Sequence, residues 1–393
     1  MFRRLRFPYT IGLVIVGMLL AIAQDHLGVM EPIRLIRLTP EVVLYLFLPT
    51  LIFPAAVQMD LRLLRQNAGP ILLLALPGLI VSTVIVGSIV AALTPLSWSR
   101  ALLFGALISA TDPVAVVALF NELKVPHRLA ILVEGESLFN DATSLVLFTV
   151  ILATIGSDAV GTTVVAQGAA RFIWVSLGGL GVGASIAVLY AVLVRLVADD
   201  PLVEIALSTV LAYMAFIVAD HYMHVSGIVA VVAAGLVARR LRLRHFDSAQ
   251  ETRLYLRHYW RYAEFVANSF VFFFLGIGGN TFLNRLHAAS LAELGYIGAA
   301  ILATVVARLV VVVGFITLWN RCTRAEPIAW GYQAVMFWPG GIRGALPLVL
   351  VLSLPLAFEQ RQLLLGLTAG VVFFTLLVAG TTAGRLIRAV APQ

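Results

Sequence analysis

The sequence has little charge and almost no cysteine. Asp, Glu, Lys and Arg make up 12% of its 393 residues, which is about half the share of a typical soluble domain. The single cysteine, Cys322, excludes a disulfide within the chain. No glycine-rich loop of the Walker type is present, so the sequence gives no reason to expect transport driven by nucleotide hydrolysis.

Apolar residues take the place of the missing charge. Hydrophobic residues make up 61% of the chain and the mean hydropathy is +1.00. A helix that crosses a bilayer needs about 20 mostly apolar residues. We therefore predict an all-α polytopic membrane protein, with one transmembrane domain over residues 1–393 and no soluble domain. The expected spans are about 8–24, 40–58, 69–93, 98–121, 128–153, 171–196, 201–220, 224–241, 259–279, 291–318, 327–353 and 361–386.

The basic residues are distributed unevenly among the segments that connect these spans. With the N-terminus in the cytoplasm, 19 of the 27 Lys and Arg side chains fall on the cytoplasmic side and 6 on the other. Cytoplasmic loops of membrane proteins are enriched in such residues. The distribution predicts an integral protein of the cytoplasmic membrane with both termini in the cytoplasm. It also explains the net charge of +7 without nucleic acid as a partner.

The fourth span, GALISATDPVAVVALF, contains a carboxylate next to a helix breaker, with Asp112 before Pro113. Proline has no N–H and disfavours helix at the preceding residue, so the carbonyl groups of Ser109, Ala110 and Thr111 should lose their helical partners. An interrupted helix with a carboxylate at membrane depth is the expected form of an ion site. A proline kink with Asp112 capping the second half-helix is a simpler and compatible interpretation.

The fifth span contains the stretch EGESLFNDATSLVLF, which is unusually polar for a buried helix. At 100° per residue, Glu134, Ser137 and Asp141 share one helix face, and Glu136 and Asn140 share the neighbouring face. Hydroxyl and carboxylate oxygens suit a hard cation. One carboxylate can hold a cation or a proton, so competition for Asp141 would couple the movements of the two in opposite directions.

The eleventh span, MFWPGGIRGALPLVL, predicts a second interrupted helix around Arg343. A simpler reading is that Gly and Pro are common in membrane helices. A permanently charged arginine in the membrane needs an anion, and we expect Glu136 to be that partner. Arg308 in the tenth span would neutralise a second buried acid or reach the membrane surface, and we favour a structural role.

Four motifs in order along the chain resemble the monovalent cation:proton antiporters of the NhaP and NHE kind. They are SATDPVAV, GESLFNDATSLVLF, VSGIVAVVAAGL and GGIRGALPLVL. The resemblance implies the sodium/proton antiporter fold, with about 12–13 helices in two inverted repeats and with spans four and eleven crossing at their unwound segments. An ion-carrying core that includes about 98–153 and 327–386 would move like an elevator against a homodimer scaffold. No cofactor is implied.

The resemblance also implies roles for individual residues. Asp141 would carry the cation, for which Na⁺ is the leading hypothesis, or the proton. Asp112, the backbone of Thr111 and Ser137 would complete or support the cation site.

Three further residues have implied roles in the core. Glu136 and Arg343 would form a buried salt bridge that steadies it. Asn140 stands where electrogenic relatives carry a second Asp, which implies electroneutral exchange of one cation for one proton. The resemblance implies no role for Glu134, and we predict that it lies in an entrance funnel, where its charge attracts cations.

One departure from the family pattern leaves the transported cation open. Pro54 occupies a position in the second span that is commonly acidic, so K⁺ or Li⁺ exchange remains an alternative to Na⁺. A cation channel and a sodium-coupled solute symporter are alternatives of another class. An intramembrane hydrolase is disfavoured because no span-centred His accompanies Ser137 and Asp141.

Overall fold

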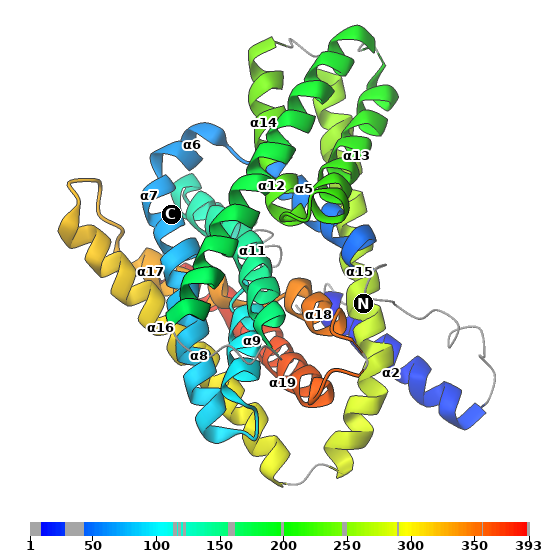
Figure 1. The fold of residues 1–393 in the computed structure, drawn as a ribbon, viewed down its shortest axis with the longest axis vertical. Coiled ribbons are helices and arrows are strands. Elements are labelled where there is room, and N and C mark those ends of the chain that lie inside the picture. Colours follow the sequence, from blue (N-terminus) through cyan, green and yellow to red (C-terminus); the bar gives the residue numbers. More distant parts are fainter. Residues whose placement is uncertain are drawn as a thin grey trace. The chain divides into compact units, whose positions relative to one another are not determined.

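The computed structural model describes residues 9–27, 43–112, 116, 119–120, 123–155, 162–197, 200–245, 250–288, 291–355 and 357–390. Within these residues every regular element is a helix, as predicted (Figure 1). The chain divides into two compact units. Unit 1 contains residues 1–40, 67–140 and 268–393, and unit 2 contains residues 41–66 and 141–267.

Unit 1 contains most of the helices that carry predicted site residues. Helix α11 passes from unit 1 into unit 2 after Asn140, and α15 enters unit 1 at Asn268. The elements of unit 1 are α2 (Tyr9–Leu27), α7 (Ala68–Leu73), η2 (Leu74–Gly78), α8 (Leu79–Leu93), α9 (Trp98–Ile108), α11 (His127–Thr154), α15 (Gln250–Ala288), α16 (Leu291–Cys322), α17 (Trp330–Phe337), η4 (Pro339–Gly341), α18 (Ala345–Leu352), α19 (Arg361–Phe374), η5 (Thr375–Ala379) and α20 (Gly380–Val390).

Unit 2 is built around three neighbouring helices, α12, α13 and α14, coloured green in Figure 1. Besides the ends of α11 and α15 that belong to it, its elements are η1 (Val43–Phe47), α5 (Leu48–Gln58), α6 (Leu61–Gln66), α12 (Thr162–Val197), α13 (Pro201–Ile217), η3 (Val218–Tyr222) and α14 (Gly227–His245).

The helices account for the predicted spans. Seven helices or continuous helical runs among the described residues are long and apolar enough to cross a membrane: Ala68–Leu93, His127–Thr154, Ala166–Leu196, Pro201–Tyr222, Leu291–Cys322, Trp330–Leu352 and Arg361–Val390. Shorter apolar helices cover Gly12–Ala21, Leu44–Gln58 and Trp98–Ile108. With α14 and α15, each of the twelve predicted spans contains a helix.

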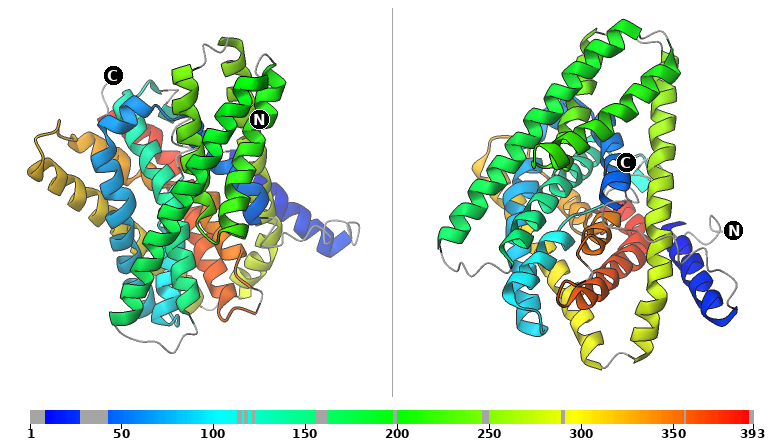
Figure 2. Two further views of the ribbon diagram at one scale, coloured as in Figure 1. Left: turned by 45° about the horizontal axis from the view of Figure 1, so that its top comes forward. Right: turned by 45° about the vertical axis from the view of Figure 1, so that its right-hand side comes forward.

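Helix α8 organises the part of unit 1 that holds the site. It packs along α9 on one side and α16 on another, and α16 also packs on α19. Helix α18, orange in Figure 2, lies beside α19 in both views. Because α9, α16 and α18 carry or flank the buried charges, this packing brings together residues that are more than 200 positions apart in the sequence.

Unit 2 is held by close helix contacts and one aromatic core. Gly183 of α12 lies so near the backbone of Ala230 in α14 that a Cβ there would be 2.7 Å from the Ala230 carbonyl carbon. The buried indole of Trp260 packs on Phe53 with ring centroids 4.8 Å apart. The Asp200 side chain accepts a hydrogen bond from the Leu202 N–H and caps α13.

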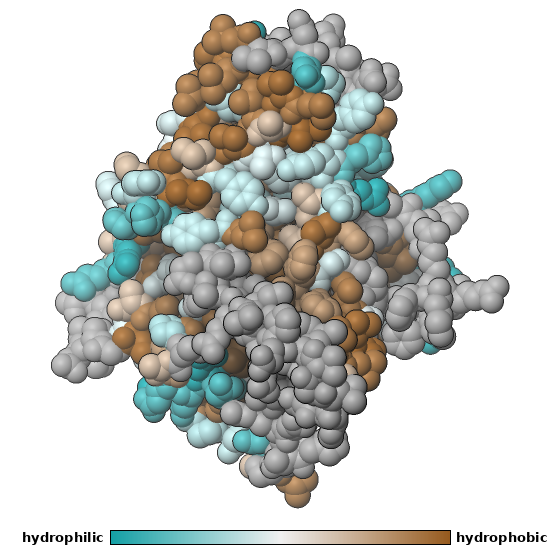
Figure 3. All heavy atoms as spheres, turned by 90° about the vertical axis from the view of Figure 1, so that its right-hand side faces the viewer, coloured by the Kyte–Doolittle hydropathy of each residue, from teal (hydrophilic) through white to brown (hydrophobic). Residues whose placement is uncertain are grey.

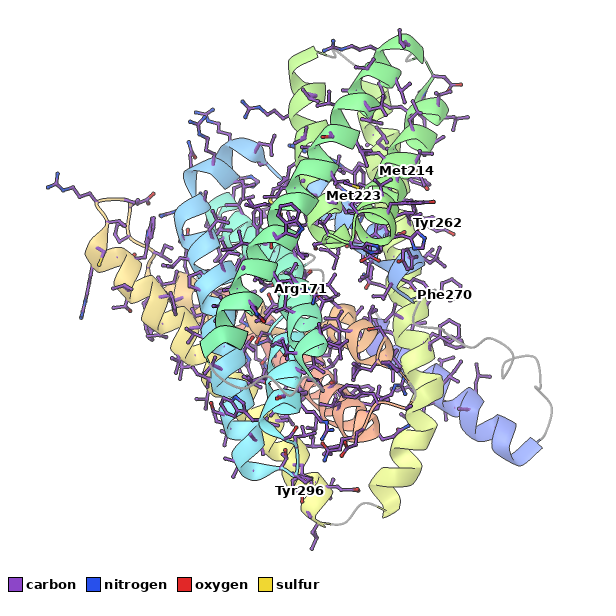
Figure 4. The ribbon with its side chains drawn as sticks, in the orientation of Figure 1. Arg171, Met214, Met223, Tyr262, Phe270 and Tyr296 are labelled. Carbon is purple, nitrogen blue, oxygen red and sulfur yellow. The ribbon has the colours of Figure 1, made fainter. Side chains whose placement is uncertain are left out.

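Much of the outer surface is apolar, as a bilayer requires. Figure 3 shows hydrophobic side chains, in brown, gathered over the helices of unit 2. Exposed examples from that unit are Trp174 on α12, Met214 on α13 and Tyr262 on α15, and Figure 4 labels the last two. In water such a surface would be an aggregation hazard, whereas in a membrane it contacts lipid or another protein.

Gly183→Ala should destabilise the protein, because the added methyl group meets the Ala230 backbone, which cannot move aside as a side chain can. Overpacking of this kind costs about 1–3 kcal/mol. The measurement is the thermal unfolding midpoint in detergent. Gly181→Ala is the matched control on the same helix, since a Cβ there meets nothing within 4 Å. Equal midpoints for the two variants would contradict the close α12–α14 contact.

Candidate functional site

The first interruption predicted from sequence is present. Helix α9 ends at Ile108, and the backbone is not helical from Ala110 to Asp112. Pro113 lies outside the described residues, so its contribution to the break stays a prediction. The break leaves the last carbonyl groups of α9 without the helical partners that a continuing helix would supply.

The second interruption lies around Arg343 and meets the first. Helix α17 ends at Phe337, a short 3₁₀ turn follows, and α18 begins at Ala345. The Asp112 N–H donates to the Ile342 carbonyl at 2.9 Å. The Asp112 side chain lies against Gly344, where a Cβ would collide with it. The predicted meeting of the two unwound segments is therefore confirmed, and the Asp112 carboxylate lies at the N-terminus of α18, where an anion is favoured.

Three predicted site residues form one hydrogen-bonded cluster. The Asn140 amide donates to the Thr111 hydroxyl at 2.7 Å and accepts from the Thr111 N–H at 3.3 Å. The hydroxyl groups of Thr111 and Ser137 are 2.9 Å apart. All three residues are buried. The cluster holds unwound Thr111 against one face of α11, with hydroxyl and amide oxygens of the kind that bind hard cations.

We predicted that Glu136 forms a buried salt bridge with Arg343, and this prediction named the wrong arginine. Glu136 pairs with Arg308 of α16 through both carboxylate oxygens, with Nη2 and Oε2 2.9 Å apart. The same guanidinium also donates to the carbonyl groups of Met336 and Gly340. Arg308 is thus the residue that neutralises a buried acid, and it joins α11, α16 and the end of α17.

Arg343 has a different anion-like partner. Its Nη1 donates to the carbonyl oxygens of Ser109 and Ala110, at 2.5 Å and 2.9 Å. Its backbone N–H donates to the Thr375 hydroxyl at 3.1 Å. The end of α9 carries partial negative charge on its free carbonyls, so the guanidinium is stabilised there by peptide dipoles. The sequence pointed to both halves of this contact, the free carbonyls and the buried arginine, but not to their pairing.

A further polar residue was missed by sequence analysis. The Ser82 hydroxyl of α8 lies 2.8 Å from that of Ser109, and Ser109 donates to the Gly105 carbonyl. A lone serine in an apolar helix gives no periodic signal, so no pattern could have found it. A cavity of about 10 Å³, room for the centre of one water molecule, is lined in part by Ser82, Ser109, Glu136, Asn140, Arg308 and Arg343.

Asp141 follows Asn140 on α11 and is half-buried. Glu134 is also half-buried and lies about two turns before it on the same helix. The structure therefore assembles Thr111, Ser137 and Asn140, while the participation of Asp112 and Asp141 in one cation site stays a prediction. Among the described residues there is no group of three or more His, Cys, Asp or Glu that could hold a metal ion.

The corrected pairing predicts the outcome of a double-mutant cycle. Glu136→Gln and Arg308→Met should each destabilise the protein by about 3–5 kcal/mol, because each leaves a buried charge or polar group without its partner. The double variant should cost clearly less than the sum. Glu136→Gln combined with Arg343→Met should be closer to additive. Thermal unfolding in detergent measures both cycles, and stronger coupling of Glu136 to Arg343 would refute the assignment.

The sequence matches a known family over almost its whole length. The family described as "Sodium/hydrogen exchanger, transmembrane" matches residues 1–389. The Na(+)/H(+) antiporter ApNhaP of Aphanothece halophytica is 36% identical over 379 residues, which cover 96% of this chain and 68% of that protein. The Na(+)/H(+) antiporter NhaP of Pseudomonas aeruginosa is 33% identical, covering 98% of this chain and 92% of that protein.

The fold also matches a solved structure, that of the sodium proton antiporter MjNhaP1 from Methanocaldococcus jannaschii at pH 8. The TM-score is 0.69 with 18% sequence identity, and the match covers 100% of both chains. The predicted antiporter fold is thereby confirmed. Together with the family match and the two meeting interruptions, this leads to one conclusion: the chain belongs to the sodium/hydrogen exchanger family, and it is an integral multi-pass membrane transporter and not an enzyme.

Proposed function

We propose that this Na⁺/H⁺ antiporter exchanges one Na⁺ for one H⁺, with Asp141 as the group that carries either ion. The observation that carries the proposal is the cluster of Thr111, Ser137 and Asn140 at the unwound segment. Ser137 lies one turn before Asp141 on the same face of α11. The cluster therefore supplies uncharged oxygen atoms that can coordinate a cation, and they lie beside Asp141, the only carboxylate of the Asn140–Asp141 pair.

Exchange follows from competition for one carboxylate. When Na⁺ binds Asp141 the proton leaves, and when a proton binds the cation leaves, so one site cannot carry both in the same direction. A gradient of either ion then drives the other. We propose that Asp112, whose side chain lies against Gly344, supports this site from the crossing of the two interruptions.

The one-to-one stoichiometry rests on Asn140. Its neutral amide leaves a single titrating group at this pair of positions, so replacing Na⁺ by H⁺ moves no net charge. The structure offers a second reason for an amide, because its NH₂ donates to the Thr111 hydroxyl while its oxygen accepts from the Thr111 N–H. A carboxylate could accept but not donate here.

The moving part and the assembly are proposals as well. Arg308 ties α11, α16 and the α17–η4 segment together, which supports movement of an ion-carrying core, including about 98–153 and 327–386, as one body. We propose an elevator-like movement of this core in a homodimer. Both termini would lie in the cytoplasm, as the distribution of basic residues indicates.

Exchange of K⁺ or Li⁺ is the second candidate. Pro54 is buried within α5, at the position that the family pattern described above leads us to expect to be acidic, so a carboxylate that could contribute to cation selection is missing there. The names of the relatives, all Na⁺/H⁺ antiporters among those compared above, favour Na⁺. Exchange measured with each cation in turn decides between the candidates.

Asp141→Asn should abolish exchange, because the amide cannot take up and release a proton. The protein is reconstituted in vesicles, a pH gradient is imposed, and its dissipation on adding Na⁺, K⁺ or Li⁺ is recorded. Glu134→Gln is the matched control on the same helix face, and we expect it to keep the maximal rate but need more Na⁺. If the Asp141→Asn variant still exchanges ions, Asp141 is not the group that carries them.

Asn140→Asp should make exchange electrogenic, because it adds a second titrating carboxylate. The rate in vesicles should then respond to an imposed membrane potential, to which the unmodified protein should be insensitive. Asn140→Ala is the control, since it removes both bonds to Thr111 without adding charge and should stay insensitive. An Asn140→Asp variant that remains electroneutral would show that this position does not set the stoichiometry by itself.

A further inference from the structure

Helices α17 and α20 of unit 1 form a groove that the transport mechanism does not use. Its volume is about 470 Å³. At its inner end the Trp338 indole N–H donates to the Thr382 hydroxyl at 2.8 Å. At its outer end Gly331 lies so close to the Val390 backbone that a Cβ would not fit. The groove is lined by Ala334, Phe337, Trp338, Thr382, Arg385 and Leu386.

The lining combines an apolar floor with a positive rim. Arg385 is exposed and makes no hydrogen bond or ion pair with the described residues. Arg388, one turn further along α20, is also exposed and donates to the Gly384 carbonyl. Neither α17 nor α20 contains an Asp or Glu. An occupant of this groove must therefore offer an apolar body and a negatively charged head.

The position of the groove along the helices suits a lipid. Both helices belong to apolar runs long enough to span a membrane, Trp330–Leu352 and Arg361–Val390. Arg385 lies five residues before the end of α20, which is about 7.5 Å along the helix axis. Trp330 at the outer end of α17 is 67% exposed, as is typical of aromatic residues at the membrane surface. The arginine and Leu386 thus lie near headgroup depth, whereas Phe337 and Trp338, about two turns from Trp330, lie at acyl-chain depth.

We propose that the α17–α20 groove binds an anionic phospholipid. Its phosphate pairs with Arg385, and one acyl chain lies along Phe337, Trp338 and Leu386. Basic pockets between membrane helices bind anionic headgroups in this way. A free phosphate would use the arginine but leave the apolar lining uncovered, which is why the lipid is the favoured source of the phosphate.

The bound lipid would reach the interrupted helix. Trp338 directly precedes the 3₁₀ turn Pro339–Gly341, and the Gly340 carbonyl accepts a hydrogen bond from Arg308. A lipid that holds the last turn of α17 against α20 therefore stabilises the segment on which the Glu136–Arg308 pair rests. Anionic lipid should raise the stability of the whole core and not only that of the groove.

The first experiment titrates the purified 393-residue chain in detergent with phosphatidylglycerol or phosphatidylcholine and follows the thermal unfolding midpoint. Phosphatidylglycerol should raise the midpoint more than phosphatidylcholine. Arg385→Gln should need about fivefold more phosphatidylglycerol for half of the effect, as expected for one arginine near an anionic surface. The control is Arg171→Gln, an exposed arginine of α12 labelled in Figure 4, which should match the unmodified protein.

The second experiment keeps the charge and fills the groove. The Ala334→Phe variant should lose the stabilisation by phosphatidylglycerol. If this variant does not fold, Leu386→Ser is used in its place, because it removes apolar lining from the groove. Glycerol 3-phosphate, a headgroup without acyl chains, should not stabilise the unmodified protein. The proposal is overturned if both groove variants respond like the unmodified protein, if glycerol 3-phosphate reproduces the effect, or if Ala334→Phe alters only the oligomeric state.

Discussion

The structure around the site depends on one buried ion pair, between Glu136 and Arg308. Two charges placed in a membrane-spanning core are costly unless each meets an opposite charge and its remaining hydrogen-bonding groups are satisfied. Arg308 meets that requirement with the carboxylate of Glu136 and the carbonyls of Met336 and Gly340. Because these groups come from three helices, the pair fixes α11, α16 and the broken α17 relative to one another within unit 1.

A second arginine solves a related problem with peptide dipoles. Breaking a helix inside a membrane leaves carbonyl groups without a hydrogen-bond donor, because no water is present there. Arg343 supplies that donor to the carbonyl groups of Ser109 and Ala110. The break at Thr111 is in turn held by Asn140 and Ser137. The backbone of both interruptions is therefore held by side chains from neighbouring segments, which compensates for part of the helical hydrogen bonding that the breaks remove.

The comparison of prediction and structure at Glu136 is instructive. The sequence identified a buried acid, two buried arginines and a set of freed carbonyls, but not the carbonyls of Met336 and Gly340 that Arg308 also contacts. Reasoning by formal charge assigned the acid to Arg343, whereas the structure assigns it to Arg308. The free carbonyls at a helix end also attract a guanidinium, and sequence spacing carries no information on which of two distant helices lies nearer.

The sequence by itself determined the class of protein, the helical spans, the two interruptions and the polar residues of the fifth span. These follow from local chemistry, since hydropathy, proline and helical periodicity act over a few residues. Only the tertiary structure decided which arginine meets Glu136, that Ser82 meets Ser109, and that Trp338 and Arg385 frame one groove. Those pairings join helices far apart in the chain, and the packing of whole helices, rather than any local pattern, sets them.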